Sequence, residues 1–226
     1  MRLFGPYIVT FRPPKPNGRG VTELHIVCQG LSQTKQGDNL LGWWSDVPLS
    51  TVGLRQSLLV AVRLQAESDI TTLYTSPLRR AVQTAHVIAD QLKVVPQRHE
   101  DLRELDCGSL DGLTYQEAYE RFPDLVVHGP QAGGTDAESY GRLQDRVSRA
   151  LGEIINRNPE GKIAVVTHGG SIVAYLRSLL GHQSSSTEEG PFFETSPASI
   201  HTLRFDADAC IVVRLNDTSH LADGPN

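Results

Sequence analysis

The sequence predicts an α/β fold in which a mainly parallel β-sheet is covered by helices on both faces. Two observations lead to this prediction. Short runs rich in β-branched residues alternate along the chain with longer segments whose apolar residues recur at helical spacing. One of these runs, KIAVVT, is apolar enough to be buried on both of its faces. Parallel neighbours need a crossover connection, usually a helix, so the alternation favours parallel strands.

Five strands are expected in this sheet. The first is a β-branched run that closes at a glycine, and the last two form a closing pair near the C-terminus. The expected strands are Glu23–Cys28, Thr71–Thr75, Lys162–Thr167, Ser199–Phe205 and Cys210–Leu215.

The segments between the strands have the periodicity and the end signals of helices. A proline near the first turn, in Ser76-Pro77, opens the second helix, and Pro123 stops the third. The expected helices are Val52–Gln65, Leu78–Leu92, Tyr115–Phe122, Ser139–Ile155 and Ser171–Leu180.

A proline- and glycine-rich extension, residues 1–22, precedes the domain proper, which we expect to cover residues 23–226. Within the extension, Tyr7–Phe11 has the composition of a short edge strand. Gly129–Ala137 and His182–Gly190 are expected to be loops because Gly, Pro and polar residues dominate them.

Composition and charge exclude several functional classes. The formal net charge is −5 and no segment is strongly basic, so the chain lacks the electrostatic footprint of a nucleic-acid-binding protein. The longest apolar run, around Ser57–Val62, is far too short to span a bilayer. The N-terminus lacks the apolar core and the cleavage site of a secretory signal. We therefore expect neither a nucleic-acid partner nor a membrane span.

The cysteine pattern indicates a reducing setting. Cys28, Cys107 and Cys210 are far apart and odd in number, and no CxxC pair occurs, so neither a disulfide framework nor a zinc site is predicted. A cytoplasmic location is expected on this ground. The sequence holds no nucleotide-binding fingerprint and no metal-ligand spacing, so we expect no cofactor and no metal. The oligomeric state stays open, with a homodimer as one option.

Polar and glycine-rich segments follow three of the expected strands. VCQGLS follows the first strand, TSPLRRA the second and VVTHGGS the third. A fourth segment, LRELDCGSLDG, carries an acidic residue in a loop bounded by glycines. Ligands of such sheets bind outside the carboxyl ends of the strands, so these four segments are expected to form the site.

The order of these segments resembles the histidine phosphatase (phosphoglycerate mutase-like) superfamily. Its members open with a strand and an Arg-His-Gly signature, and a strand ending in His-Gly-Gly follows later. Between residues 22 and 221 this chain has, in order, TELHIVCQGLS, GWWSDVPLSTVG, SPLRRAVQTA, LRELDCGSLDGL, VVTHGGS and LNDTSHL. The resemblance implies a three-layer sandwich with a mainly parallel central sheet. It also implies a site for a small phosphorylated or otherwise anionic molecule.

In the superfamily a histidine attacks phosphorus, arginines and a second histidine surround the phosphoryl oxygens, and a glutamate transfers the proton. The resemblance places Arg80 at the second arginine, Glu104 at the general acid and His168 at the second histidine. Lys35 falls where an asparagine often helps to hold phosphate.

The signature itself departs from the superfamily pattern. Cys28 stands where arginine is expected and Gln29 where the nucleophilic histidine is expected, while Gly30 is retained. A carboxamide nitrogen is a very poor nucleophile, although Gln29 can still donate and accept hydrogen bonds. We therefore expect the ordinary phosphohistidine reaction to be absent, with Gln29, Cys28 and Gly30 lining the site for the ligand.

Cys28 and His168 are the substitutes to consider. Cysteine phosphatases need a Cys-x5-Arg loop, and the sixth residue after Cys28 is Thr34, so a small buried thiol is the favoured interpretation of Cys28. His168 lies across the phosphate from the nucleophile in the resembling proteins. There it can serve with Glu104 in acid–base chemistry such as hydrolysis, elimination or isomerisation.

Three functions remain open. The first is an enzyme of altered chemistry on a small anionic or phosphorylated metabolite, with Glu104 and His168 as acid–base residues and Arg80 as the anion binder. The second is an inactive pseudophosphatase that binds a phosphorylated ligand or a partner protein. The third is a weak phosphomonoesterase.

Residues 135–137 are inserted before Glu138-Ser139 relative to the superfamily's Gly-Gly-Glu-Ser segment, and we expect them to reshape the substrate lid.

Overall fold

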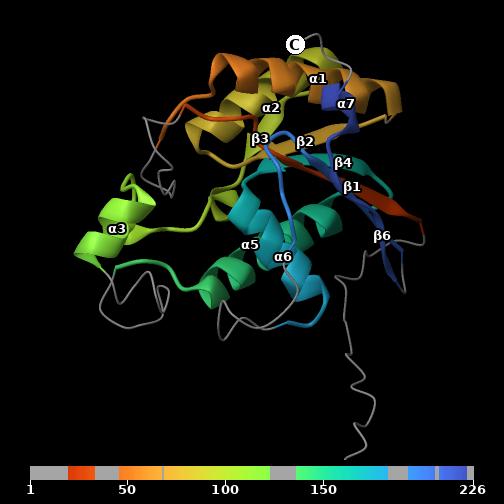
Figure 1. The fold of residues 1–226 in the computed structure, drawn as a ribbon. Helices are drawn as coiled ribbons and strands as arrows, with labels where there is room; N and C mark the ends of the chain where they lie inside the picture. Colours follow the sequence, from red (N-terminus) through yellow and green to blue (C-terminus); the bar gives the residue numbers. More distant parts are fainter. Residues whose placement is uncertain are drawn as a thin grey trace, which may run out of the picture.

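A computed structural model describes residues 20–33, 46–67, 69–122, 136–182, 193–206 and 209–222. Within these residues a single sheet of six strands has the order β3-β2-β4-β1-β5-β6 (Figure 1). The strands are β1 (Thr22–Cys28), β2 (Thr72–Thr75), β3 (Pro96–Arg98), β4 (Lys162–Thr167), β5 (Ile200–Phe205) and β6 (Cys210–Asp217). β1, β2, β3 and β4 pair in parallel, whereas β5 pairs antiparallel to β1, and β6 antiparallel to β5. The predicted mainly parallel sheet is therefore confirmed.

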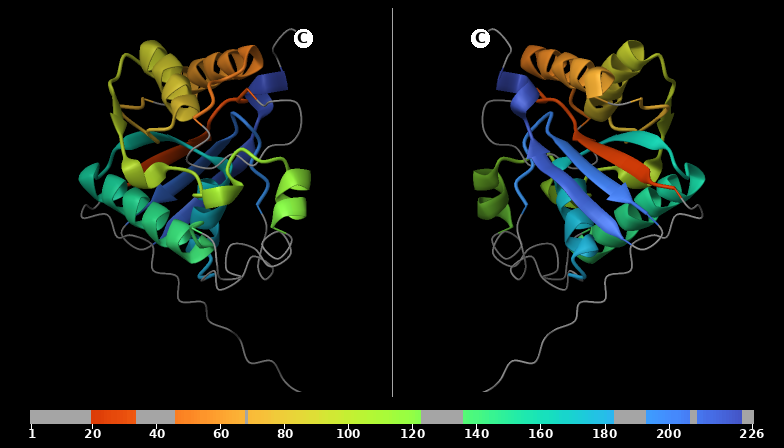
Figure 2. Two further views of the ribbon diagram at one scale, coloured as in Figure 1. Left: turned by 90° about the vertical axis from the view of Figure 1, so that its left-hand side faces the viewer. Right: turned by 90° about the vertical axis from the view of Figure 1, so that its right-hand side faces the viewer.

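Helices cover both faces of this sheet, which gives three layers (Figure 2). α1, α2 and α7 lie over one face and α5 and α6 over the other, while α3 is set apart from the sheet (Figure 1). The α-helices are α1 (Thr51–Glu67), α2 (Arg79–Leu92), α3 (Tyr115–Arg121), α5 (Tyr140–Arg157), α6 (Gly169–Leu179) and α7 (Ser219–Ala222), and the 3₁₀ turns are η1 (Glu100–Leu102) and η2 (Gly108–Leu110). This arrangement confirms the predicted three-layer sandwich.

Side-chain alternation along the central strands supplies both cores. In β4, Ile163 and Val165 pack into the core beneath α5 and α6, whereas Ala164 and Val166 pack into the core beneath α1 and α2. Successive side chains of a strand point to opposite faces, so an uninterrupted apolar run is what a strand buried on both faces requires.

Several observed elements differ from the expected ones. β3 was not expected, because three residues that begin with Pro96 carry no strand periodicity. α6 begins at Gly169 rather than Ser171, although glycine has a low helix propensity. β6 extends to Asp217, beyond the expected end at Leu215. Tyr7–Phe11 and most of the two expected loops lie outside the described residues.

No helix within the described residues is long and apolar enough to cross a membrane.

Candidate functional site

The carboxyl ends of β1, β2 and β4 meet at one edge of the sheet. Cys28 pairs with Thr167 in the parallel ladder between β1 and β4. At the next positions the Gln29 amide donates to the Thr167 carbonyl at 3.0 Å, and the Ser76 amide donates to the Val166 carbonyl at 2.9 Å. The residues that follow these three strands are therefore neighbours, as the sequence predicted.

Gly30 allows α1 to approach the turn after β1 closely. Its amide donates to Thr84 Oγ1 in α2 at 3.1 Å. A Cβ at Gly30 would lie 2.4 Å from the backbone oxygen of Gly53 in α1, too close for any larger residue. The preceding carbonyl, that of Gln29, accepts from the Ala198 amide at 3.0 Å. Backbone hydrogen bonds at Gln29 and the Thr84 hydroxyl at Gly30 thus hold the turn, and the half-buried Gln29 side chain projects from a fixed position.

His168 immediately precedes α6 and is 1 % exposed. Its Nε2 lies 2.7 Å from the hydroxyl oxygen of Ser76. Burial lowers the pKa of His168 well below its ordinary value, and the positive charges of Arg80 and Arg146 lower it further. The imidazole is therefore neutral near pH 7. Its Nδ1 is buried and has no hydrogen-bond partner in the part of the chain that the structure describes.

Arg80 lies on the first turn of α2 and is also only 1 % exposed. Burial lowers the pKa of this guanidinium, and the nearby carboxylates of Glu104 and Asp111 oppose the change. An arginine stays protonated even so, so the site holds a buried positive charge among acidic groups.

Glu104 lies in the loop between η1 and η2. Its Oε1 accepts from the Leu105 amide at 2.8 Å, and its Oε2 accepts from the Gly170 amide at 2.9 Å. The second contact brings the carboxylate to the N-terminus of α6, where the helix dipole favours negative charge. A Cβ at Gly170 would lie 2.4 Å from Glu104 Oε1, so glycine is what allows this approach.

Cys28 is 3 % exposed and packs in the core beneath α5 and α6. Burial foremost, and then the charge of Glu104, raise the pKa of this thiol to about 12. The thiolate is the nucleophilic form of cysteine. Cys28 is accordingly a neutral thiol near pH 7, which agrees with the structural interpretation of this residue.

Cys28, Gln29, Gly30, Arg80, Glu104 and His168 thus gather at one edge of the sheet, while Lys35 lies outside the described residues. Arg146, Glu138 and Ser76 were not among the predicted site residues. Arg146 donates to the Glu104 carbonyl at 2.7 Å and pairs with Glu138. The signal that could have revealed it is a charged residue on the apolar stripe of an amphipathic helix, between Leu143 and Val147.

Residue 136, in the inserted segment, contacts η2, which follows the loop that carries Glu104. Asp136 Oδ1 accepts from both the amide and the hydroxyl of Ser109 at 2.9 Å, at the start of η2. The carboxylate thus ties residue 136 to this turn. The expected effect of residues 135–137 on a substrate lid stays a prediction, because residue 135 and the segment before it lie outside the described residues.

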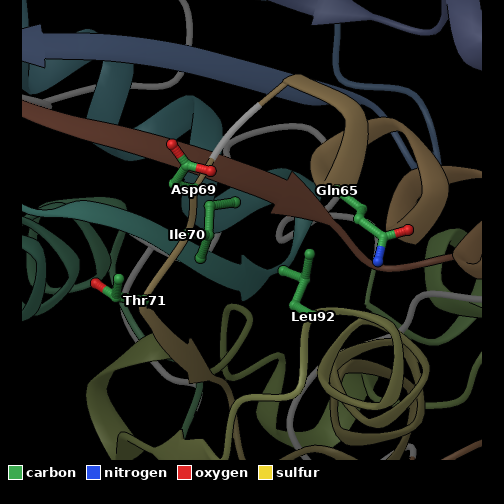
Figure 3. Close-up of a pocket in the computed structure, with 5 residues that line it drawn as sticks. All are labelled: Gln65, Asp69, Ile70, Thr71 and Leu92. Carbon is green, nitrogen blue, oxygen red and sulfur yellow. The ribbon is translucent and has the colours of Figure 1, made fainter.

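A separate pocket of about 310 Å³ lies at the opposite end of β2 (Figure 3). Gln65 and Leu92, near the ends of α1 and α2, line it together with the segment that leads into β2. The lining residues are Gln65, Asp69, Ile70, Thr71 and Leu92. With Asp69 as its one charged side chain, this pocket lacks the convergent polar groups of the edge formed by β1, β2 and β4.

Comparisons with known proteins agree with this architecture. The chain is 35 % identical over 188 residues to phosphoglycerate mutase-like protein 4 of Arabidopsis thaliana, covering 79 % of this chain and 78 % of the relative. It is 31 % identical over 218 residues to the metal-independent phosphoserine phosphatase of the same plant, covering 89 % and 84 %.

Solved structures show the same fold. YhfR of Bacillus stearothermophilus superimposes with a TM-score of 0.80 at 23 % identity, covering 88 % of this chain and 99 % of that protein. A phosphoserine phosphatase of Entamoeba histolytica, solved with 3-phosphoglyceric acid, has a TM-score of 0.72 at 23 % identity and covers 88 % and 99 %. A family model for branch 1 of the histidine phosphatase superfamily matches residues 24–218. The chain belongs to the histidine phosphatase superfamily.

Proposed function

We propose that the chain binds a small phosphorylated or otherwise anionic metabolite at the edge formed by β1, β2 and β4. It transforms this molecule by acid–base chemistry that does not pass through a phosphohistidine. Arg80 binds the anion, and Glu104 and His168 transfer protons. The observation that carries the proposal is the buried Nδ1 of His168, which lacks a partner in the described part of the chain beside the buried charge of Arg80.

An anion would give His168 Nδ1 the partner that it lacks among the described residues, and its negative charge would suit the buried guanidinium of Arg80. A buried polar atom without a hydrogen bond costs about 1–3 kcal/mol, and a buried guanidinium is best matched by a planar or phosphate anion. Two relatives point to the same class of ligand. One is called a phosphoserine phosphatase, and a structural neighbour was solved with 3-phosphoglyceric acid. We therefore assign a phosphorylated metabolite to this chain.

Residues 28 and 29 set the chemistry apart from that of the superfamily. In our proposal Gln29 stands at the position of the nucleophilic histidine, where its carboxamide can orient a ligand but cannot attack phosphorus. Cys28 does not replace it, because a thiol with a pKa of about 12 is protonated near pH 7. The remaining proton-transfer group at the N-terminus of α6 is Glu104, beside the neutral His168. We place this activity in the cytoplasm, since all three cysteines are free.

One observation favours a second candidate, a phosphate-binding pseudoenzyme. Both oxygens of Glu104 already accept backbone amides, at 2.8 Å and 2.9 Å. A carboxylate held in this way can serve to fix a loop rather than to move protons. In that case Arg80 and His168 would bind the ligand and Glu104 would not act on it.

The deciding experiment measures conversion of a phosphomonoester panel that includes phosphoserine and 3-phosphoglycerate, with product detection by mass spectrometry. The same samples are searched for phosphohistidine. The unaltered chain is compared with Glu104→Gln, with Gln29→His alone and combined with Cys28→Arg, and with the control Glu153→Gln. The control removes a carboxylate from the exposed side of α5. Binding of inorganic phosphate is measured by calorimetry in parallel.

We expect conversion without a phosphohistidine, and a loss of about 100-fold or more in Glu104→Gln, the scale of general acid–base catalysis. The control should retain full activity. If no substrate is converted and Glu104→Gln binds phosphate normally, the chain is a binder. A phosphoenzyme in the unaltered chain would refute the proposal and leave a weak phosphomonoesterase with another nucleophile.

A further inference from the structure

Arg146 of α5 is 7 % exposed and points into the loop between η1 and η2. Arginine has five N–H donors in a rigid fork, and here the fork joins two segments. It donates to the backbone oxygens of Asp101 at 3.0 Å, Arg103 at 2.7 Å and Glu104 at 2.7 Å. It also donates to the two carboxylate oxygens of Glu138 at 2.6 Å and 2.7 Å.

The sheet and α6 also hold this loop. Thr167 Oγ1 donates to the Leu102 carbonyl at 2.7 Å, and Ser171 Oγ donates to the Arg103 carbonyl at 2.8 Å. Every carbonyl from residue 101 to residue 104 therefore accepts a hydrogen bond from a side chain. With these four carbonyls bound, the Glu104 side chain leaves the loop in a set direction, toward the Gly170 amide.

Glu138 extends this attachment beyond Glu104. Its amide donates to the Asp106 carbonyl at 2.8 Å, and its Oε2 accepts from the Asp106 amide at 3.3 Å. Glu138 thus binds Asp106 through its amide and its carboxylate, and the same carboxylate accepts from Arg146. The N-terminal part of α5 and the segment before it form one support for residues 101–106.

We infer that Arg146, with Glu138, is the positioning residue for Glu104, and that it holds the carboxylate at the N-terminus of α6. This inference rests on the proposed function only in assigning proton transfer to Glu104. A buried ion pair adds little net stability compared with apolar residues of similar volume, because desolvation of both charges offsets their attraction. The planar guanidinium of Arg146 binds three backbone carbonyls at once, and neither lysine nor an apolar residue can reproduce these contacts.

Arg149 provides a matched control. It lies on the same helix and bonds to the same loop, but from the surface, through Asp101 Oδ2 at 3.1 Å. Arg149→Met therefore removes an arginine contact to the loop without touching the carbonyls that Arg146 binds. Arg146→Lys keeps the positive charge but loses the fork. The main test variant, Arg146→Met, removes the guanidinium. Glu138→Gln keeps the side-chain volume but weakens the ion pair with Arg146, and it replaces Arg146→Met as the test variant if that protein fails to fold.

The first readout is amide hydrogen exchange, which needs no substrate. The Leu105 and Gly170 amides both donate to Glu104, so their protection reports whether the carboxylate is in place. In Arg146→Met and Arg146→Lys we expect protection at these two amides to fall at least about tenfold more than at amides in the middle of β1 and β4. Arg149→Met should leave them unchanged. Equal losses at all of these amides, or no loss at Leu105 and Gly170, would overturn the inference.

The second readout separates this inference from the proposed function. Because Arg146 acts through Glu104 rather than on the anion, the dissociation constant for inorganic phosphate should change less than about threefold in Arg146→Lys, while kcat on any converted substrate falls at least about tenfold. If the two amides lose protection but Glu104→Gln converts every substrate normally, the positioning role stands and the proposed chemistry fails.

Discussion

At the residue scale, the contact between Ser76 and His168 determines which ring nitrogen faces a ligand. The Ser76 hydroxyl oxygen accepts from the Leu78 amide at 3.3 Å and lies 2.7 Å from His168 Nε2. A hydroxyl has one hydrogen to donate, and within the described residues His168 Nε2 is the acceptor in reach of it. Donation from Ser76 leaves the ring proton on Nδ1, the nitrogen that lacks a partner there. A neutral imidazole would then present an N–H to an anion.

We predict that His168 is a neutral imidazole protonated on Nδ1 in the ligand-free protein, even at pH 6. The low pKa has burial as its main cause, with Arg80 next. Two-dimensional ¹H–¹⁵N spectra of the histidine ring distinguish the two tautomers and the imidazolium. Ser76→Ala should weaken the preference for this tautomer. An imidazolium at pH 7, or a proton fixed on Nε2, would contradict the prediction.

The sequence allowed the candidate site residues to be identified, but not the residue that positions one of them. Arg80, Glu104 and His168 could be named because each lies in a segment that resembles a superfamily motif, and the structure brings them together. Arg146 could not be named in the same way. Its role depends on three carbonyls that are far from it in sequence, and such contacts arise only once α5 packs beside the η1 loop.

At the element scale, the start of α6 shows why local propensity misplaced a boundary. Glycine disfavours helix, so Ser171 was the expected first residue. The helix begins at Gly169 instead, because the Glu104 carboxylate packs against Gly170 and accepts its amide. A tertiary contact has overridden the propensity of two residues. β3 was missed for the opposite reason, since its three residues owe their strand conformation to pairing with β2.

The two glycines at the start of α6 allow a prediction that compares their substitution by alanine. A Cβ at Gly169 would meet no atom closer than 3.9 Å, whereas one at Gly170 would lie 2.4 Å from Glu104 Oε1. Gly169→Ala should therefore raise the free energy of unfolding by up to about 1 kcal/mol, through reduced entropy of the unfolded chain. Gly170→Ala should lower it by about 1 kcal/mol because Glu104 loses its amide partner.

Urea denaturation of the two variants measures the difference. Any turnover that depends on Glu104 should fall in Gly170→Ala and persist in Gly169→Ala. Equal stabilities for the two variants would mean that the carboxylate does not need its contact with the helix N-terminus.

At the scale of the whole molecule, the buried histidines couple the stability of the fold to pH. Burial is the main cause that lowers the pKa of His25, His168, His201 and His220. His201 in β5 is fully buried, and its Nδ1 accepts from the Asn216 amide at 3.3 Å, which requires an unprotonated nitrogen. The folded protein therefore keeps these rings neutral while the unfolded chain protonates them in mildly acidic solution.

His201 allows the size of this coupling to be stated. Its pKa falls from 6.5 in the unfolded chain to about 4 in the folded protein. Below pH 6.5 the unfolded state binds the extra proton, so stability falls with pH until the folded state also protonates near pH 4. One pKa unit corresponds to about 1.4 kcal/mol, so this residue should account for a loss of roughly 3 kcal/mol between those limits.

We predict that His201→Gln reduces the pH dependence of unfolding by this amount. Urea denaturation at several values between pH 7 and pH 4.5 gives the free energy of unfolding of each protein. The variant is destabilised at pH 7, where it loses the ring's packing and its bond to Asn216, and its curve should approach that of the unaltered chain as the pH falls. His86→Gln, at an exposed position of α2, is measured alongside as a second histidine substitution. If His201→Gln instead runs parallel to the unaltered chain, His201 is protonated in the folded protein above pH 6, and the buried ring must have gained an acceptor that stabilises its charge.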